Sequence, residues 1–183
     1  MKQNHDPSSS EEISDMESWE RSFWLARAYM EASLHLCRSM LDGGFSSQYS
    51  SSRVVLHLAR QGIELFLKGA LIAHSQTATL ATHNIQDLYL KYRKLYRDKI
   101  FDIDIPPRFF VSPNFDLFPD TLNAFHATLD QRHRYAADRQ GNTFATKEIF
   151  EPKTTLAELE LIDRQLKIVE WSYIRQLTKE DPQ

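Results

Sequence analysis

A set of polar side chains recurs along one segment of this chain at the three- and four-residue intervals of a helix face. The set comprises Arg53, His57, Arg60, Gln61, Glu64 and Lys68. Side chains at such intervals project from one side of an α-helix, so these form a narrow polar stripe on an otherwise apolar helix. The stripe could bind an anionic nucleotide, because arginine, histidine and lysine donate hydrogen bonds to phosphate and Glu64 could orient them.

Two structural interpretations of the stripe stand beside this functional one. Glu64 and Lys68 could form an ion pair on the exposed edge of a core helix, which stabilises a helix by roughly 0.2–0.5 kcal/mol. Alternatively, the stripe could contact the turn at Thr82 and His83 inside a helical bundle and fix the geometry of that turn. His83 follows a candidate helix cap, so it is either part of the cap or a site residue.

Basic and aromatic residues are interleaved over 91–99. Lysine and arginine could contact phosphates there while Tyr92 and Tyr96 stack on bases of single-stranded RNA. The alternative is an amphipathic helix whose tyrosines point inward. Arg132, Arg134 and Arg139 form a second basic cluster beside Tyr135.

His126, Asp130 and His133 share one helix face at intervals of four and three residues. Imidazole and carboxylate at this spacing could ligate zinc or iron. A metal site in a helical bundle needs matching ligands from other helices, and no second motif of this kind occurs. A solvated face is therefore preferred, and the sequence predicts no metal and no other cofactor.

The composition is that of one soluble globular domain. The chain has 183 residues, of which 42% are hydrophobic and 26% charged, and its net charge is −3. This charge attracts neither nucleic acid nor anionic membrane, so such binding would need a local basic patch. The single cysteine, Cys37, excludes an internal disulfide and is typical of a reducing compartment. No apolar run approaches the roughly 18 residues of a membrane span. We expect a cytoplasmic protein that does not associate with membranes.

Apolar periodicity predicts an all-α, mostly antiparallel bundle of about five helices over residues 13–178. A disordered tail is expected at 1–12 and a flexible end at 179–183. A further helix is predicted over 120–134.

Four signals mark the expected helix ends. Ser14–Glu17 and Thr155–Glu158 have the spacing of capping boxes that would open the first and last helices. Gly43–Gly44 would end the first helix, and Thr82–Asn84 would start the third.

Residues 98–120 break the helical pattern. Prolines at 106, 107, 113 and 119 exclude a long helix there. The segment is nevertheless too apolar to lie free in solvent, since it contains Phe101, Ile103, Ile105, Phe109, Phe110, Phe115 and Phe118. It is predicted to be an ordered loop that packs on the bundle or forms part of a partner interface.

Three motifs follow one another in a recognisable order: Gln61-x-x-Glu64-x-x-x-Lys68, then Thr82-His83-Asn84, then Arg134-Tyr135-Ala136. Over about residues 16–177 the chain resembles the HEPN superfamily, the helical domains named for higher eukaryotes and prokaryotes nucleotide-binding. The resemblance implies a HEPN-like helical fold, a homodimer and a nucleotide or RNA ligand.

The chain departs from the HEPN pattern in two places. The family's Arg-Tyr-Pro appears here as Arg134-Tyr135-Ala136. Nuclease members also carry an arginine, then four to six residues, then a histidine, and none of the seven histidines here has an arginine at that spacing. The nearest pair, Arg53 and His57, is one residue too close, so the resemblance implies a member without ribonuclease activity.

The leading hypothesis is a non-catalytic HEPN-like domain in a bacterial accessory or stress-related system. It would bind a nucleotide or RNA, or pair with a protein that does. The expected binding residues are Arg53, His57, Glu64, Lys68, His83, Arg134 and Tyr135. One alternative is a divergent, toxin-like, metal-independent ribonuclease, in which Arg134 works with His83 or His133. The other is a protein-interaction scaffold that docks a partner through the 98–120 loop.

Overall fold

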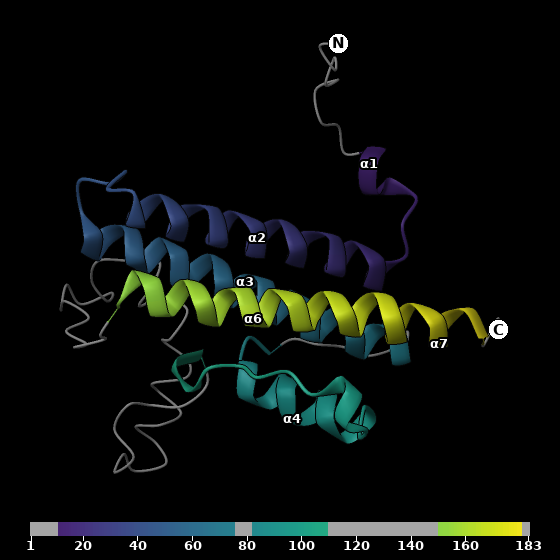
Figure 1. Cartoon of the computed structure of the whole chain (residues 1–183). Coiled ribbons are helices and arrows are strands. Elements are labelled where there is room, and N and C mark those ends of the chain that lie inside the picture. The colour runs from purple at the N-terminus through teal and green to yellow at the C-terminus, as the bar shows by residue number, and fades with distance from the viewer. Residues whose placement is uncertain (1–10, 76–81, 110–149, 181–183) are drawn as a thin grey trace, which may run out of the picture.

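Helix α3, Gln48–His74, lies at the centre of the structure. In this computed structural model, which describes residues 11–75, 82–109 and 150–180, α3 packs against α2 (Ser18–Leu41), α4 (Ile85–Leu95) and α6 (Pro152–Val169). Helices α2, α3 and α6 lie alongside one another, and α4 lies on the side of α3 that faces away from α2 (Figure 1). The striped helix is therefore the most enclosed one, as its apolar circumference predicts.

All described secondary structure is helical, which confirms the all-α prediction; the described residues contain no strand. The shorter elements are α1 (Glu11–Ser14), η1 (Lys99–Phe101), η2 (Pro107–Phe109), the π-helical turn η3 (Glu170–Ile174) and α7 (Arg175–Glu180). The helix predicted over 120–134 and the tail over 1–10 lie outside the described residues. Residues 11 and 12 belong to α1 instead of the tail predicted at 1–12.

Neither helix begins at its predicted cap: the first start is displaced by three residues and the last by four. Helix α2 begins after Glu17 instead of Ser14, and the Glu20 side chain accepts a hydrogen bond from the Glu17 backbone N–H (3.3 Å). Helix α6 begins after Glu151, whose carboxylate accepts from the N–H groups of Lys153 and Thr154. A hydrogen bond from the Thr154 side chain lowers the pKa of Glu151 most strongly, followed by the backbone hydrogen bonds from Thr154 and Lys153. Carboxylate side chains thus cap both helices, whereas the sequence predicted that the hydroxyl groups of Ser14 and Thr155 would do so.

Polar contacts fix α2 against its two neighbours. The buried Ser33 hydroxyl donates to the Val55 carbonyl of α3 (2.9 Å). The Cys37 thiol contacts the Pro152 carbonyl at the start of α6 (3.4 Å), and burial raises the pKa of this thiol to about 11. Cys37 is therefore a protonated core residue at neutral pH.

Small residues allow α2 and α3 to approach closely. A Cβ atom added to Gly62 would lie 2.8 Å from Met30 Cγ and 3.1 Å from the Ala26 carbonyl oxygen. Met30 is buried, so it could make room for this atom only by rearranging within the core. The absence of a side chain at Gly62 therefore sets the spacing between these helices.

Gly62→Ala is expected to lower the free energy of unfolding by about 1–3 kcal/mol, because overpacking outweighs the better helix propensity of alanine. Urea unfolding measures the loss. The same substitution in a Met30→Ala background should be much less harmful, since the added methyl group then has room. Equal losses in the two backgrounds would show that Met30 is not the obstacle.

The described half of the apolar loop belongs to the core. Phe101, Ile103, Ile105 and Phe109 are all buried. Tyr92 of α4 donates a hydrogen bond to the Phe101 carbonyl (2.8 Å). The prediction of an ordered, packed loop is confirmed for 98–109, and residues 110–120 lie outside the described residues.

The tyrosines of α4 point into the protein. Tyr92 and Tyr96 are buried, and Tyr96 donates to the Ala70 carbonyl of α3 (2.8 Å). Burial raises the pKa of Tyr92 strongly and that of Tyr96 to about 12. These rings cannot stack on RNA bases, so the structural interpretation of the basic and aromatic run is confirmed.

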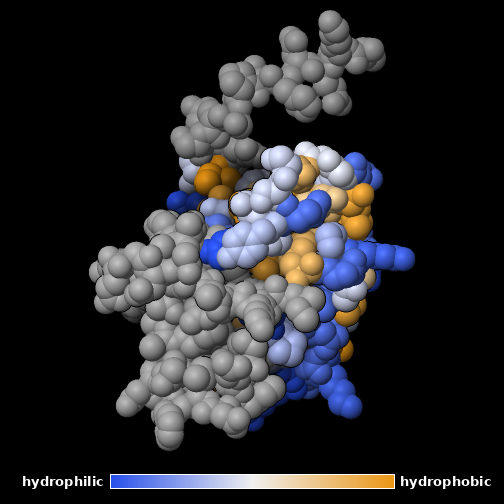
Figure 2. All heavy atoms as spheres, turned by 90° about the vertical axis from the view of Figure 1, so that its left-hand side faces the viewer, coloured by the Kyte–Doolittle hydropathy of each residue, from blue (hydrophilic) through white to orange (hydrophobic). Residues whose placement is uncertain are grey.

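The surface mixes apolar and charged side chains. Figure 2 views the end of the bundle where α2 passes into α3 and shows hydrophobic atoms among hydrophilic ones. Leu41 and Val54 are exposed on the two helices at this end. No helix within the described ranges has the length and apolar character needed to cross a bilayer.

Candidate functional site

The middle of the polar stripe is enclosed by the protein. Arg60 is only 1% exposed and Glu64 only 3%. The middle of the stripe is therefore not a window to water. The expected i,i+4 pair of Glu64 and Lys68 does form (2.9 Å), but Glu64 does not lie on an exposed edge. Ion-pairing and hydrogen-bonding groups are found at such depth only when they have partners.

Arg60 joins three segments of the chain. Its guanidinium donates to the backbone carbonyl of His83 (2.6 Å) and to that of Phe109 (3.3 Å). The first contact holds the turn before α4, and the second holds η2. The interpretation that the stripe fixes the turn at Thr82 and His83 is thus confirmed.

One oxygen of Glu64 contacts the nitrogens of two side chains. Its Oε1 lies 2.9 Å from Lys68 Nζ and 2.8 Å from His83 Nδ1. Lys68 can only donate, so Oε1 accepts a hydrogen bond from its ammonium group. We assign His83 the tautomer in which Nδ1–H donates to the same oxygen, which leaves Nε2 without this contact.

The second oxygen of Glu64 does not contribute to stability through a hydrogen bond. Glu64 Oε2 is buried, and the described part of the chain offers it no hydrogen-bond partner. An unsatisfied buried acceptor destabilises a protein by about 1–3 kcal/mol. The buried carboxylate therefore positions Lys68 and His83 at a cost in stability. Such a cost is typical of a functional site.

The turn that carries His83 is held from several directions. Thr82 Oγ1 accepts from the Asn84 N–H (3.1 Å), and Asn84 Oδ1 accepts from the Gln86 N–H (3.0 Å) at the first turn of α4. Ile85 and Leu88 anchor the helix in the core. The His83 ring, 73% exposed, thus projects from a fixed backbone.

The charges around this site favour an anion. Arg60 and Lys68 each lie one helical turn from Glu64 on α3, and protonation of His83 adds a third positive charge. The N-terminus of α4 contributes a partial positive charge at the same turn. The Lys68 side chain is 16% exposed, so its ammonium group can be reached from outside.

Arg53 and His57 lie apart from this cluster. Arg53 donates to the Tyr49 hydroxyl (3.0 Å) near the start of α3, about 22 Å along the helix from Lys68. His57 is half-buried, about 10 Å along the helix from Glu64. Arg134 and Tyr135 lie outside the described residues, as do the candidate metal ligands His126, Asp130 and His133.

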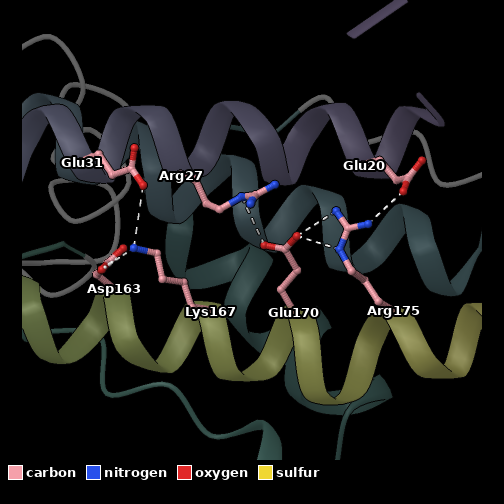
Figure 3. Close-up of polar contacts among 7 residues, drawn as sticks. All are labelled: Glu20, Arg27, Glu31, Asp163, Lys167, Glu170 and Arg175. Atoms are coloured by element: carbon pink, nitrogen blue, oxygen red, sulfur yellow. Dashed lines mark hydrogen bonds and ion pairs between the residues drawn. The ribbon is translucent and has the colours of Figure 1, made fainter. Parts of the chain in front are cut away.

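The structure also contains a charged cluster that the sequence did not reveal. Glu170, in the π-helical turn η3, is 1% exposed, and its Oε1 accepts from Arg175 Nε (2.9 Å). Arg27 Nε lies 3.6 Å from the other Glu170 oxygen, and Arg175 also pairs with Glu20 (2.9 Å). Figure 3 shows Arg27 of α2 directed at Glu170 across the interface, and Arg175, from the same helical run as Glu170, placed between Glu170 and Glu20 of α2.

Tryptophan rings cover this second cluster. The Arg27 guanidinium lies 4.5 Å from the Trp24 ring centre, and that of Arg175 lies 4.5 Å from the Trp171 ring centre. Their positive charges are thus compensated by carboxylates and aromatic faces. The cluster is a clamp between helices. A sequence signal existed, because Glu170 occupies a core position four residues after Leu166.

Comparisons with protein-family models, with curated proteins and with solved structures find no match to this chain. Among residues 11–75, 82–109 and 150–180, no group of three or more histidine, cysteine, aspartate or glutamate side chains is placed to hold a metal ion.

Proposed function

We propose that this chain is a HEPN-like domain that binds a nucleotide or RNA through its phosphate groups and does not cleave it. The observation that carries the proposal is the convergence of Lys68 and His83 on buried Glu64. A HEPN-like member would act as a homodimer, alone or with a protein that handles nucleotides, in a bacterial accessory or stress-related system.

Lys68 and His83 are close enough to bind the same phosphate group. Their nitrogens contact one Glu64 oxygen at 2.9 and 2.8 Å, so Nζ and Nδ1 are at most 5.7 Å apart. The lysine ammonium has three donors and uses one for Glu64. Protonated His83 would donate its Nε2–H to a second phosphate oxygen. Arg134, from the Arg-Tyr-Ala motif, is proposed to add a further contact.

Lys68→Met is expected to weaken binding of ADP or of a short single-stranded RNA by about 10- to 100-fold. The reason is that a hydrogen bond to a charged group contributes about 1.5–3 kcal/mol. Isothermal titration calorimetry measures the ADP affinity, and fluorescence anisotropy measures the RNA affinity. Lys91→Met, on the exposed face of α4, is the matched control and should bind like the parent.

The double variant Lys68→Ala with Arg134→Ala extends this test. It should retain its fold by circular dichroism and lose more affinity than Lys68→Met alone. Unchanged affinity of a folded double variant would overturn the site assignment. Labelled RNA kept with the protein in EDTA should stay intact. Cleavage that Arg134→Ala abolishes would instead support the ribonuclease alternative.

The scaffold alternative gains no support from the described half of the loop. Phe101, Ile103, Ile105 and Phe109 are buried in this chain's own core, so docking through them would require the core to open. Ile100 is 49% exposed, but one exposed aliphatic side chain does not form an apolar patch. Residues 110–120 lie outside the described residues.

A further inference from the structure

His83 has one ring nitrogen occupied and the other accessible. Nδ1–H donates to buried Glu64, so in the neutral imidazole the lone pair resides on Nε2. The side chain is 73% exposed, and the Lys68 ammonium lies beside it on the same carboxylate. An accessible nucleophile next to a fixed cation has the composition of a group-transfer site.

We propose that His83 Nε2 accepts a phosphoryl group from an acyl phosphate and forms phosphohistidine. The inference rests on the proposed function in one respect, since Lys68 would hold the phosphoryl oxygens in both cases. It goes further because it makes His83 a covalent acceptor as well as a ligand contact.

The transfer balances without an additional reactant. The Nε2 lone pair attacks phosphorus and forms the N–P bond, while the bond from phosphorus to the carboxylate oxygen of the donor breaks. The donor leaves as a carboxylate with the bonding electron pair and needs no proton. The ring keeps its Nδ1 proton and becomes cationic, and the Glu64 carboxylate at 2.8 Å stabilises that charge as it develops.

Each neighbour has a defined task in this step. Glu64, held in place by its burial, selects the His83 tautomer that carries its proton on Nδ1. Lys68 offsets the charge of the incoming phosphoryl oxygens. The Arg60 contact to the His83 carbonyl (2.6 Å) keeps the turn from moving as the bond forms.

Two other described histidines, His35 and His74, lack this environment. His35 is exposed on α2, but no carboxylate contact to its ring occurs within the described ranges. His74 is exposed at the end of α3 and packs its ring edge against Tyr96. Both therefore serve as internal controls, since they share the solvent exposure of His83 without a buried carboxylate partner.

The test is incubation of the full chain with acetyl phosphate, followed by peptide mass spectrometry and phosphorus NMR. The expected product is one acid-labile, alkali-stable phosphoryl group on Nε2 of His83. His83→Gln should abolish it, and Glu64→Gln should slow its formation by roughly tenfold or more while the chain stays folded. Phosphorylation of Nδ1, labelling of His35 at an equal rate, or an unchanged rate in Glu64→Gln would each overturn the inference.

The same samples separate this inference from the proposed function. ADP affinity is measured on the unphosphorylated protein before the donor is added. Protein that binds ADP but gains no phosphoryl group would overturn the acceptor role alone. Protein that gains the group but binds neither ADP nor RNA would overturn the proposed function and leave the acceptor role standing.

Discussion

Arg60→Met is expected to lower the free energy of unfolding by about 3–5 kcal/mol and to loosen the turn that carries His83. The methionine keeps most of the buried volume but removes the donors to the His83 and Phe109 carbonyls. Both acceptors then lose a charge-assisted hydrogen bond, and buried Glu64 loses a positive charge one turn away. Urea unfolding measures the stability, and amide hydrogen exchange in α4 reports on the turn.

The matched control is Arg164→Met, the same substitution at an exposed position of α6. It should change stability by less than about 0.5 kcal/mol. An Arg60→Met variant as stable as this control would mean that the guanidinium does not tie the turn to α3. If Arg60→Met is folded at low temperature, its affinity for ADP should also fall, because His83 is no longer held beside Lys68.

Glu170→Gln is expected to destabilise the protein by about 3 kcal/mol. The glutamine keeps the shape of the side chain but leaves Arg27 and Arg175 without the buried carboxylate that faces both. The pair between Arg175 and Glu20 is retained. Removing one member of a buried ion pair leaves an uncompensated charge, which is the most destabilising way to break it. Thermal and urea unfolding measure the effect.

Two comparisons make this prediction specific. Glu160→Gln removes the partner of Arg38 at an exposed position and should have an effect below about 1 kcal/mol. Replacing Arg27, Glu170 and Arg175 together by methionine, leucine and methionine should recover much of the lost stability, because no buried charge is then left unpaired. A Glu170→Gln variant no worse than Glu160→Gln would contradict the clamp between α2 and the C-terminal helices.

The all-α fold class and the central position of α3 could be predicted from the sequence because both depend on local periodicity. Apolar residues cover most of the circumference of α3, so this helix must be enclosed by others. The helix starts were harder to predict. The predicted cap Ser14 lies three residues from the observed cap Glu17, and the predicted cap Thr155 lies four residues from the observed cap Glu151. Each is an acceptable start by local rules, and Pro152 also favours the observed start of the last helix. Packing of the helix against the core decides between them.

The limits of the sequence are clearest at Arg60 and Glu64. Periodicity places both on the same face as Arg53 and His57, but the direction of a side chain does not reveal which segment lies over it. That depends on α4 and η2, which approach the C-terminal half of the stripe from distant parts of the chain. The result is a small site at Glu64, Lys68 and His83 instead of one surface along the whole helix.

The most direct test of the account is the imidazole signal of His83 during titration with ADP or a short oligoribonucleotide. The protein is labelled with nitrogen-15 at histidine, and His83→Gln assigns the signal. We predict a saturable shift at Nε2 that disappears in Lys68→Met, while the signal of His35 stays in place. A His83 signal that remains unmoved by both ligands up to about 1 mM would contradict phosphate binding at this site.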